Sequence, residues 1–292
     1  MKINKFVLMI ILIFTITFFS LGCGVKRTVE VTGDITEKTF EVKECSKLLI
    51  KNIYLSNETG ILPKVKIIPS SERQVVVYAN ESLVNEIKVK KSGEYLNITA
   101  DSNSRYNTEF LIIEIHGFSF ERIRLTSFDA TIESGAIERK ARLDFSSACR
   151  VDLESYEFDD LDLYISGASS VKANSLIGED AEVTISGAST LKVSNILIDD
   201  CDIKSSGASR IDLTGNIIDL DLNISGASTF DSKKLIVNDC DLECSGASNV
   251  RIAFTNSLNG DISGASRVVY YGPKESAHFD VSGGSSYEQG KD

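Results

Sequence analysis

The chain has 292 residues, with 42 acidic against 31 basic side chains and a formal net charge of −11. A hydrophobic content of 42% with 25% charged residues argues against global disorder, and the length permits one large or two medium domains with a real core. The acid excess lies in the second half, because residues 131–292 hold 27 acidic and 14 basic side chains whereas residues 23–130 hold 15 of each. Such a surface repels phosphate groups, so no nucleic-acid partner is expected.

Residues 1–22 have the pattern of a secretory signal. The basic residues Lys2 and Lys5 come first, an almost wholly apolar run follows over 6–19, and small residues stand just before Cys23. The run is shorter than the ~20 residues that a membrane-spanning helix needs. A Cys at this position resembles the bacterial lipoprotein signal, which implies cleavage before it and attachment to its thiol of a diacylglycerol that carries palmitate-type acyl chains. The alternative is an uncleaved membrane anchor with an incidental Cys.

The chain is accordingly divided into three parts. We expect residues 1–22 to be a lipoprotein signal peptide, 23–37 a lipid-anchored polar tether, and 38–292 the folded part. The folded part has a less regular section, 38–126, and a regular section, 127–285. The predicted location is the extracytoplasmic side of a bacterial cell or outer membrane, with the membrane bound through the lipid.

A tetrapeptide, Ser-Gly-Ala-Ser, recurs along the regular section. Complete copies begin at Ser166, Ser186, Ser206, Ser225, Ser245 and Ser263. Worn copies begin at Ser127, Ser146 and Ser282, so the steps between copies are 18 to 20 residues. The five residues before the first five complete copies read LDLYI, AEVTI, CDIKS, LDLNI and CDLEC, with apolar or small residues at the first, third and fifth positions. Such alternation is typical of a β-strand.

The repeat predicts the architecture. Each unit of ~20 residues offers about three short strands, and these bury an inner face only when each strand pairs in parallel with its counterpart in the next unit. We therefore predict an all-β fold, a right-handed parallel β-helix with coils of ~20 residues, its handedness following the general crossover preference. A leucine-rich repeat has a similar period but needs an Asn in fixed register, whereas Asn174, Asn195 and Asn216 drift.

One glycine stands at the second position of each motif copy. We predict that these glycines form a structural corner that needs positive φ or close backbone approach. The flanking serines are expected to bond neighbouring coils or the turn backbone. The functional alternative is a face of small residues that binds a partner. The glycines are Gly167, Gly187, Gly207, Gly226, Gly246, Gly264 and Gly283.

An acidic residue occupies the second position of the five-residue pattern in five consecutive coils. It points outward, because the positions on either side point inward. The five residues are Asp162, Glu182, Asp202, Asp221 and Asp241. Their carboxylates would lie ~5 Å apart and repel one another, and bound Ca²⁺ or another hard cation would relieve this repulsion. The alternative to this possible cation-binding column is a solvated face with basic neighbours such as Lys204 and Arg210; no other metal or cofactor is expected.

Catalysis is the competing class of function. Acids paired across a groove could hydrolyse or cleave a polysaccharide, a chemistry that many β-helices host. Such a site should interrupt the coils with a long loop, but the coils over 146–285 differ by only two residues in length, so no catalytic residue is predicted. The cysteines after residue 23 are expected to be core thiols, since Cys201 and Cys240 would lie two coils apart, ~9.6 Å, beyond the ~7 Å reach of a disulfide.

The repeats and the end of the chain together resemble a known family. The segment from Asp261 to Pro273 is followed by the worn copy within 281–285, and strand-like runs at 74–78 and 109–115 come in the family's order. These features resemble the putative auto-transporter adhesin, head GIN domain family over roughly residues 38–289. The resemblance implies a β-helical fold and extracytoplasmic placement, with no catalytic residues to carry over.

Two functional hypotheses follow. The first is a non-enzymatic, lipid-anchored envelope protein that presents a β-helical surface for binding or scaffolding, with adhesion implied by the family resemblance alone. Its partner would be an unidentified envelope protein or a glycan. The second is a polysaccharide-active hydrolase or lyase. A pocket of unlike acids and Arg would favour the enzyme, whereas smooth ladders of repeated residues would favour the binding surface.

Overall fold

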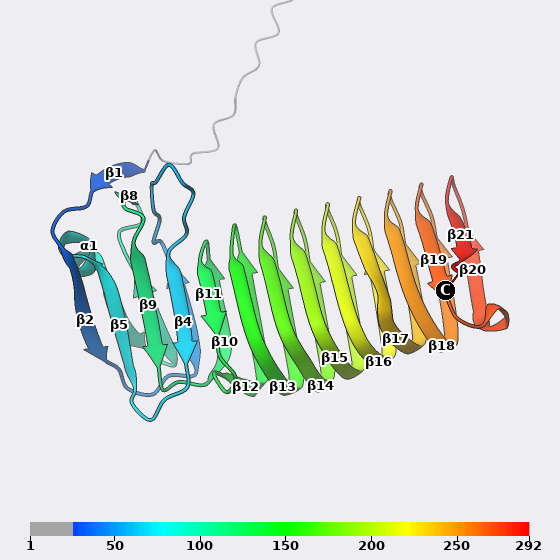
Figure 1. Cartoon of the computed structure of the whole chain (residues 1–292), viewed down its shortest axis with the longest axis horizontal. Helices are drawn as coiled ribbons and strands as arrows, with labels where there is room; N and C mark the ends of the chain where they lie inside the picture. The colour runs from blue at the N-terminus through cyan, green and yellow to red at the C-terminus, as the bar shows by residue number, and fades with distance from the viewer. Residues whose placement is uncertain (1–25, 292) are drawn as a thin grey trace, which may run out of the picture.

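The computed structural model describes residues 26–291, so the predicted signal peptide and Cys23 lie outside the described residues. The chain winds into a solenoid whose coils stack along the long axis of the molecule (Figure 1). From β10 (Phe120–Thr126) onward the strands pair only in parallel, which confirms the predicted parallel β-helix. No helix within residues 26–291 is long and apolar enough to cross a membrane.

Two runs of strands begin the solenoid. The first has the order β2 (Ile35–Glu41), β5 (Gln74–Asn80), β9 (Leu111–His116), β4 (Lys64–Ile68) and β11 (Asp129–Ile132). The second has the order β6 (Lys88–Ser92), β7 (Tyr95–Thr99), β3 (Lys47–Lys51) and β10. The pairs β2–β5, β5–β9 and β6–β7 are antiparallel. A short helix, α1 (Glu81–Glu86), follows β5 and buries Leu83 and Val84.

The segment expected to be a tether is partly folded. β1 (Arg27–Glu30) pairs in parallel with β8 (Ser104–Asn107), and β2 already begins at Ile35. Val29 and Val31 pack against the core, and this contact explains why the segment is folded. The tether prediction is therefore wrong for residues 27–30 and 35–37, because the strands that pair with this charged segment lie far along the chain.

Each regular coil contains one long, bent strand. These strands are β13 (Arg150–Ile165), β14 (Ser170–Ile185), β15 (Thr190–Ser205), β16 (Arg210–Ile224), β17 (Thr229–Cys244) and β18 (Asn249–Ile262), whereas the coil before them is divided between β11 and β12 (Ile137–Ser146). The start of β13 pairs with β11 and its end pairs with β12, so one strand serves both runs. We call the surface built by the strand starts face 1, and the surface built by the strand ends face 2. The last coil comprises β19 (Arg267–Tyr271), a 3₁₀ turn η1 (Lys274–Ser276), β20 (Ala277–Val281) and β21 (Ser286–Gln289).

The interior is a stack of apolar columns. At the end of β13, Leu161, Leu163 and Ile165 are buried, and each pairs with a buried apolar residue of β14. Full burial of one Leu or Ile contributes roughly 1.5–3 kcal/mol. Because alternate residues must point away from this interior, the same pattern fixes which side chains form face 2.

The corner between coils is set by backbone stacking. All seven motif glycines have φ between +71° and +79°. At Gly207 an added Cβ would lie 2.5 Å from the carbonyl oxygen of Gly187. Ala208 donates its N–H to that same oxygen at 2.7 Å, and the buried Ser209 hydroxyl donates to the carbonyl of Ser206 at 2.8 Å. The corner thus requires a residue without a side chain at this position.

Candidate binding face

The strand register assembles the predicted acidic column on face 2. Its members oppose one another in sequence order from coil to coil: Asp162, Glu182, Asp202, Asp221 and Asp241. Arg142 precedes the column in register, and Asn259 and then His278 follow it. The column therefore begins with a cation and ends with polar groups.

A second acidic column, which the sequence pattern did not predict, runs beside the first. Its members also oppose one another from coil to coil: Asp160, Asp180, Asp200, Asp219 and Asp239. Each stands two residues before a member of the first column, so both columns project from the same face. In the sequence, this column corresponds to the acid that stands immediately before the first position of the five-residue pattern. We call these ten residues the acidic double ladder.

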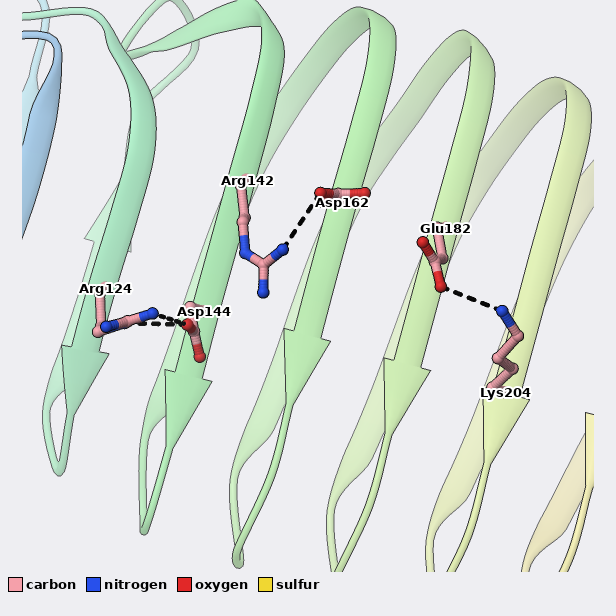
Figure 2. Close-up of polar contacts among 6 residues, drawn as sticks. All are labelled: Arg124, Arg142, Asp144, Asp162, Glu182 and Lys204. Atoms are coloured by element: carbon pink, nitrogen blue, oxygen red, sulfur yellow. Dashed lines mark hydrogen bonds and ion pairs between the residues drawn. The ribbon is translucent and has the colours of Figure 1, made fainter.

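Basic side chains compensate the double ladder at one end only. Figure 2 shows Arg142 beside Asp162, with Nη1 3.6 Å from Oδ2, and Lys204 reaching Glu182 at 3.1 Å. Arg124 pairs with Asp144 at 2.8 Å, in coils closer to the start of the solenoid. Among residues 26–291 no other member of the double ladder makes an ion pair, so eight of its ten carboxylates have no basic partner.

Neutral donors serve the last carboxylates instead. Asn259 donates its side-chain N–H to Asp241 at 3.1 Å, and Asn256 donates to Asp239 at 2.7 Å. Such bonds satisfy oxygen lone pairs without neutralising the charge. The net negative charge of this part of face 2 therefore persists.

Two carboxyl groups of the first acidic column have a raised pKa. Partial burial raises the pKa of Asp162, against the lowering effect of Arg142. Partial burial also raises the pKa of Asp221, and the charges of Asp202 and Asp241 raise it further. A raised carboxyl pKa means that the folded state disfavours the ionised form. A cation placed between the carboxylates would reverse that preference.

Face 2 is hollowed in two places. A groove of about 320 Å³ lies over the double ladder from Asp160 to Asp221. A larger groove of about 870 Å³ lies over the ends of β15 to β18 and over β20 and β21, and is lined by Lys204, Glu243 and Tyr287, among others. The two grooves share Asp202 and Asp221, so they are continuous along the face.

The carboxylates of the double ladder do not form a preorganised metal site. Within the part of the chain that the structure describes, no group of three or more His, Cys, Asp and Glu side chains is arranged to hold a metal ion. The Ca²⁺ hypothesis therefore rests on pairs of neighbouring carboxylates and stays a prediction.

The thiols lie in the core and are poor nucleophiles. Cys45, Cys149, Cys201, Cys240 and Cys244 are buried and unpaired among residues 26–291. Burial raises the pKa of the Cys201 thiol to about 12 and also raises that of Cys240. Because the thiolate is the reactive species, these groups are inert at neutral pH.

The fold and this face define a class of protein, a β-solenoid that displays regular ladders of charge. A family model described as "Putative auto-transporter adhesin, head GIN domain" matches residues 62–273, and the chain belongs to this family. The resemblance predicted from the repeated motif is thereby confirmed.

Solved structures share the fold. A putative adhesin from Parabacteroides merdae ATCC 43184 is 16% identical, with a TM-score of 0.64, and the match covers 90% of this chain and 99% of that one. A putative lipid binding protein from Parabacteroides distasonis ATCC 8503 is 11% identical, with a TM-score of 0.67 and coverage of 91% and 100%. A putative adhesin from the same organism is 15% identical, with a TM-score of 0.61 and coverage of 90% and 100%. No curated protein matches the sequence.

Proposed function

We propose that the protein is a non-enzymatic, lipid-anchored component of the bacterial cell envelope that binds a basic partner protein through the acidic double ladder. Family membership supports an adhesin-like role outside the cytoplasm. The observation that carries the proposal is the set of eight carboxylates without a basic partner, held in register on one exposed face.

The repulsion between carboxylates of the double ladder favours binding of a positively charged surface, because such a surface would relieve it. Carboxylates stacked at the ~4.8 Å spacing of strands repel one another, and this repulsion adds to partial burial in raising the pKa of Asp221. A docked surface rich in Lys and Arg relieves it, and the negative potential steers such a surface during approach. The larger groove of about 870 Å³ beside Lys204 gives room for protruding side chains of the partner.

The anchor would hold one end of the solenoid at the membrane. β1 begins at Arg27, so the four residues from Cys23 span at most about 14 Å when fully extended. β1 lies at the same end as β2 and α1, opposite the end that carries β21 (Figure 1). The coils with the double ladder would therefore project away from the bilayer.

Metabolic labelling with an alkyne analogue of palmitate tests the anchor. We expect label in the wild-type chain and none in Cys23→Ser, and we expect only the wild type to resist washing from membranes, because acyl chains supply the binding energy. A wild-type chain that stays unlabelled in the membrane fraction would instead support an uncleaved apolar anchor.

Binding to defined probes tests the partner class. The full chain is titrated with a Lys/Arg-rich peptide, with a Glu-rich peptide of the same length, and with neutral glycans. We expect binding of the basic peptide alone, weakening as salt is added. Asp180→Asn/Asp200→Asn should weaken it by roughly fivefold or more. The matched control, Asp152→Asn/Asp212→Asn, removes two charges from face 1 and should leave affinity nearly unchanged. Glycan binding without peptide binding would contradict the proposed partner class.

A further inference from the structure

The last coil of the described chain leaves the solenoid open on both faces. Among residues 26–291, β20 pairs only with β18, and β21 pairs only with β19. Each strand therefore has one edge whose backbone N–H and C=O groups lack a strand partner. Val281 and Tyr287 stand in inward columns, yet they are 43% and 49% exposed, whereas Ile262 and Val268 one coil earlier are 1% and 0% exposed.

The opposite end of the solenoid is built differently. There α1 buries Leu83 and Val84 against the core. The edge strands carry alternating charges: β6 reads Lys-Val-Lys-Lys-Ser and β2 reads Ile-Thr-Glu-Lys-Thr-Phe-Glu. Lysines on an edge are a common device against strand addition. β20 and β21 read Ala-His-Phe-Asp-Val and Ser-Tyr-Glu-Gln, without a lysine.

The open end is also aromatic. The ring centroids of Tyr270 and Phe279 lie 5.5 Å apart, and those of Phe279 and Tyr287 lie 4.6 Å apart. Tyr270 is buried, Phe279 is half-buried and Tyr287 is exposed, so the cluster runs from the core to the surface. Rings of this kind contribute large apolar area to an interface.

We propose that this end pairs with the same end of a second copy of the chain, forming a head-to-head dimer with one continuous core. A two-fold axis normal to faces 1 and 2 reverses the strand direction and keeps each face with itself. β20 then pairs antiparallel with β20 of the second copy, and β21 with β21. Inward side chains remain inward, and both open edges are satisfied together.

The outward side chains of β20 complement those of a second copy of β20 in one register, which favours a second copy as the partner at this edge. On β20 the inward residues are Ala277, Phe279 and Val281, and the outward ones are His278 and Asp280. A pairing centred on Phe279 places His278 opposite Asp280 of the second copy, twice by symmetry. Centring on His278 or on Asp280 would place identical groups opposite each other. An imidazole can donate a hydrogen bond to a carboxylate across a strand pair, whereas two carboxylates opposite each other repel and destabilise the pair.

Sedimentation of the full chain in density-matched detergent tests the dimer. We expect the wild type to dimerise at micromolar concentration and His278→Asp to weaken the dimer by about tenfold or more, because two like-charged pairs then face each other. The swapped variant His278→Asp/Asp280→His restores the two imidazole–carboxylate pairs and should restore the dimer. Asn259→Asp, in the same column one coil away from the edge, is the matched control and should dimerise as the wild type does.

A second variant acts on the backbone edge. Val281→Lys places an inward-pointing charge at the edge and should leave the chain monomeric, with an unchanged strand circular dichroism spectrum showing that the coils remain folded. A wild type that stays monomeric at about 100 μM, a dimer that tolerates both His278→Asp and Val281→Lys, a swap that fails to restore pairing, or open-ended filaments would each overturn the proposal.

Discussion

At the scale of single residues, the corner glycines are required for two reasons. The backbone there is left-handed, and the neighbouring coil leaves no room for a Cβ atom. Gly207 and Gly60 have φ of +79° and +69°. A Cβ at Gly60 would meet nothing within 4 Å, whereas a Cβ at Gly207 would lie 2.5 Å from the carbonyl oxygen of Gly187. Both positions carry the same conformational cost for a larger residue, and only Gly207 adds a collision with the neighbouring coil.

Alanine substitution separates these two costs. We expect Gly60→Ala to lower the free energy of unfolding by about 1–2 kcal/mol, the penalty of a left-handed residue. Gly207→Ala should lower it by roughly 3 kcal/mol or more, because backbone atoms of adjacent coils must also move apart. Urea unfolding of both variants measures the difference. Equal losses would mean that close approach plays no part in selecting the glycine.

Asp221 carries a prediction about pH. Its folded pKa is raised, chiefly by partial burial and then by neighbouring carboxylates, so the folded state binds the proton more tightly than the unfolded chain does. Stability from this group therefore increases as pH falls from above the raised pKa toward the unfolded value, and the ionised form costs stability at neutral pH.

We expect Asp221→Asn to raise the melting temperature at pH 7 by about 1–3 °C. The advantage over the wild type should shrink as the pH approaches 4. Asp212→Asn, on face 1, serves as the control and should change the melting temperature by less than about 1 °C. A lower melting temperature for Asp221→Asn would show that the carboxylate makes a stabilising interaction in the folded state.

At the scale of strands, the double ladder converts a local alternation into a continuous charged surface. Parallel pairing in register places each acid beside its counterpart, as at Asp200 opposite Asp219. Repulsion along the ladder does not unfold the strands, because the residues next to the acids, such as Leu161 and Leu163, are buried in the core. The apolar interior thus carries the fold, and the outer positions are free to carry charge.

Calcium tests whether the first acidic column holds a hard cation. We expect CaCl₂ to raise the melting temperature of the wild type more than NaCl of equal ionic strength does, and a chelator to reverse the effect, because a bridging ion neutralises two carboxylates at once. In Asp202→Asn/Asp221→Asn the two salts should act alike. Identical melting curves for the wild type in both salts would exclude cation binding by the column.

Alternation and period sufficed to predict the coils, the parallel pairing and the outward direction of residues such as Asp162. The neighbouring Asp160 column was not predicted, because it lies just before the alternating apolar residues that define the five-residue pattern. The beginning of strand β2 was not predicted, because its partner β5 is distant in sequence and its own residues are mostly polar or charged. Exposure of Val281 could not be read from the pattern, since the same alternation buries its counterpart Ile262.

At the scale of the whole molecule, the excess acidic residues of the second half lie on the outer surface of the coils. The repeat predicted a solenoid, and the strand register shows that much of the charge lies in two adjacent columns of face 2. Stability of such a stack is close to a sum over coils and their interfaces. The molecule should therefore tolerate changes in the number of coils more readily than changes in register.

Deletion of one whole coil tests this view. Removing residues 186–205 joins Ile185 to Ser206, so a corner again follows an inward residue and the neighbouring columns realign. We expect a folded chain with a strand spectrum and a melting temperature lowered by roughly 2–6 °C, because one coil and its interface are lost. Removing only residues 186–195 deletes a corner and leaves half a coil, so the coils on either side cannot stack in register and the melting temperature should fall further than in the whole-coil deletion. If both deletions melt alike, the coils do not act as interchangeable units.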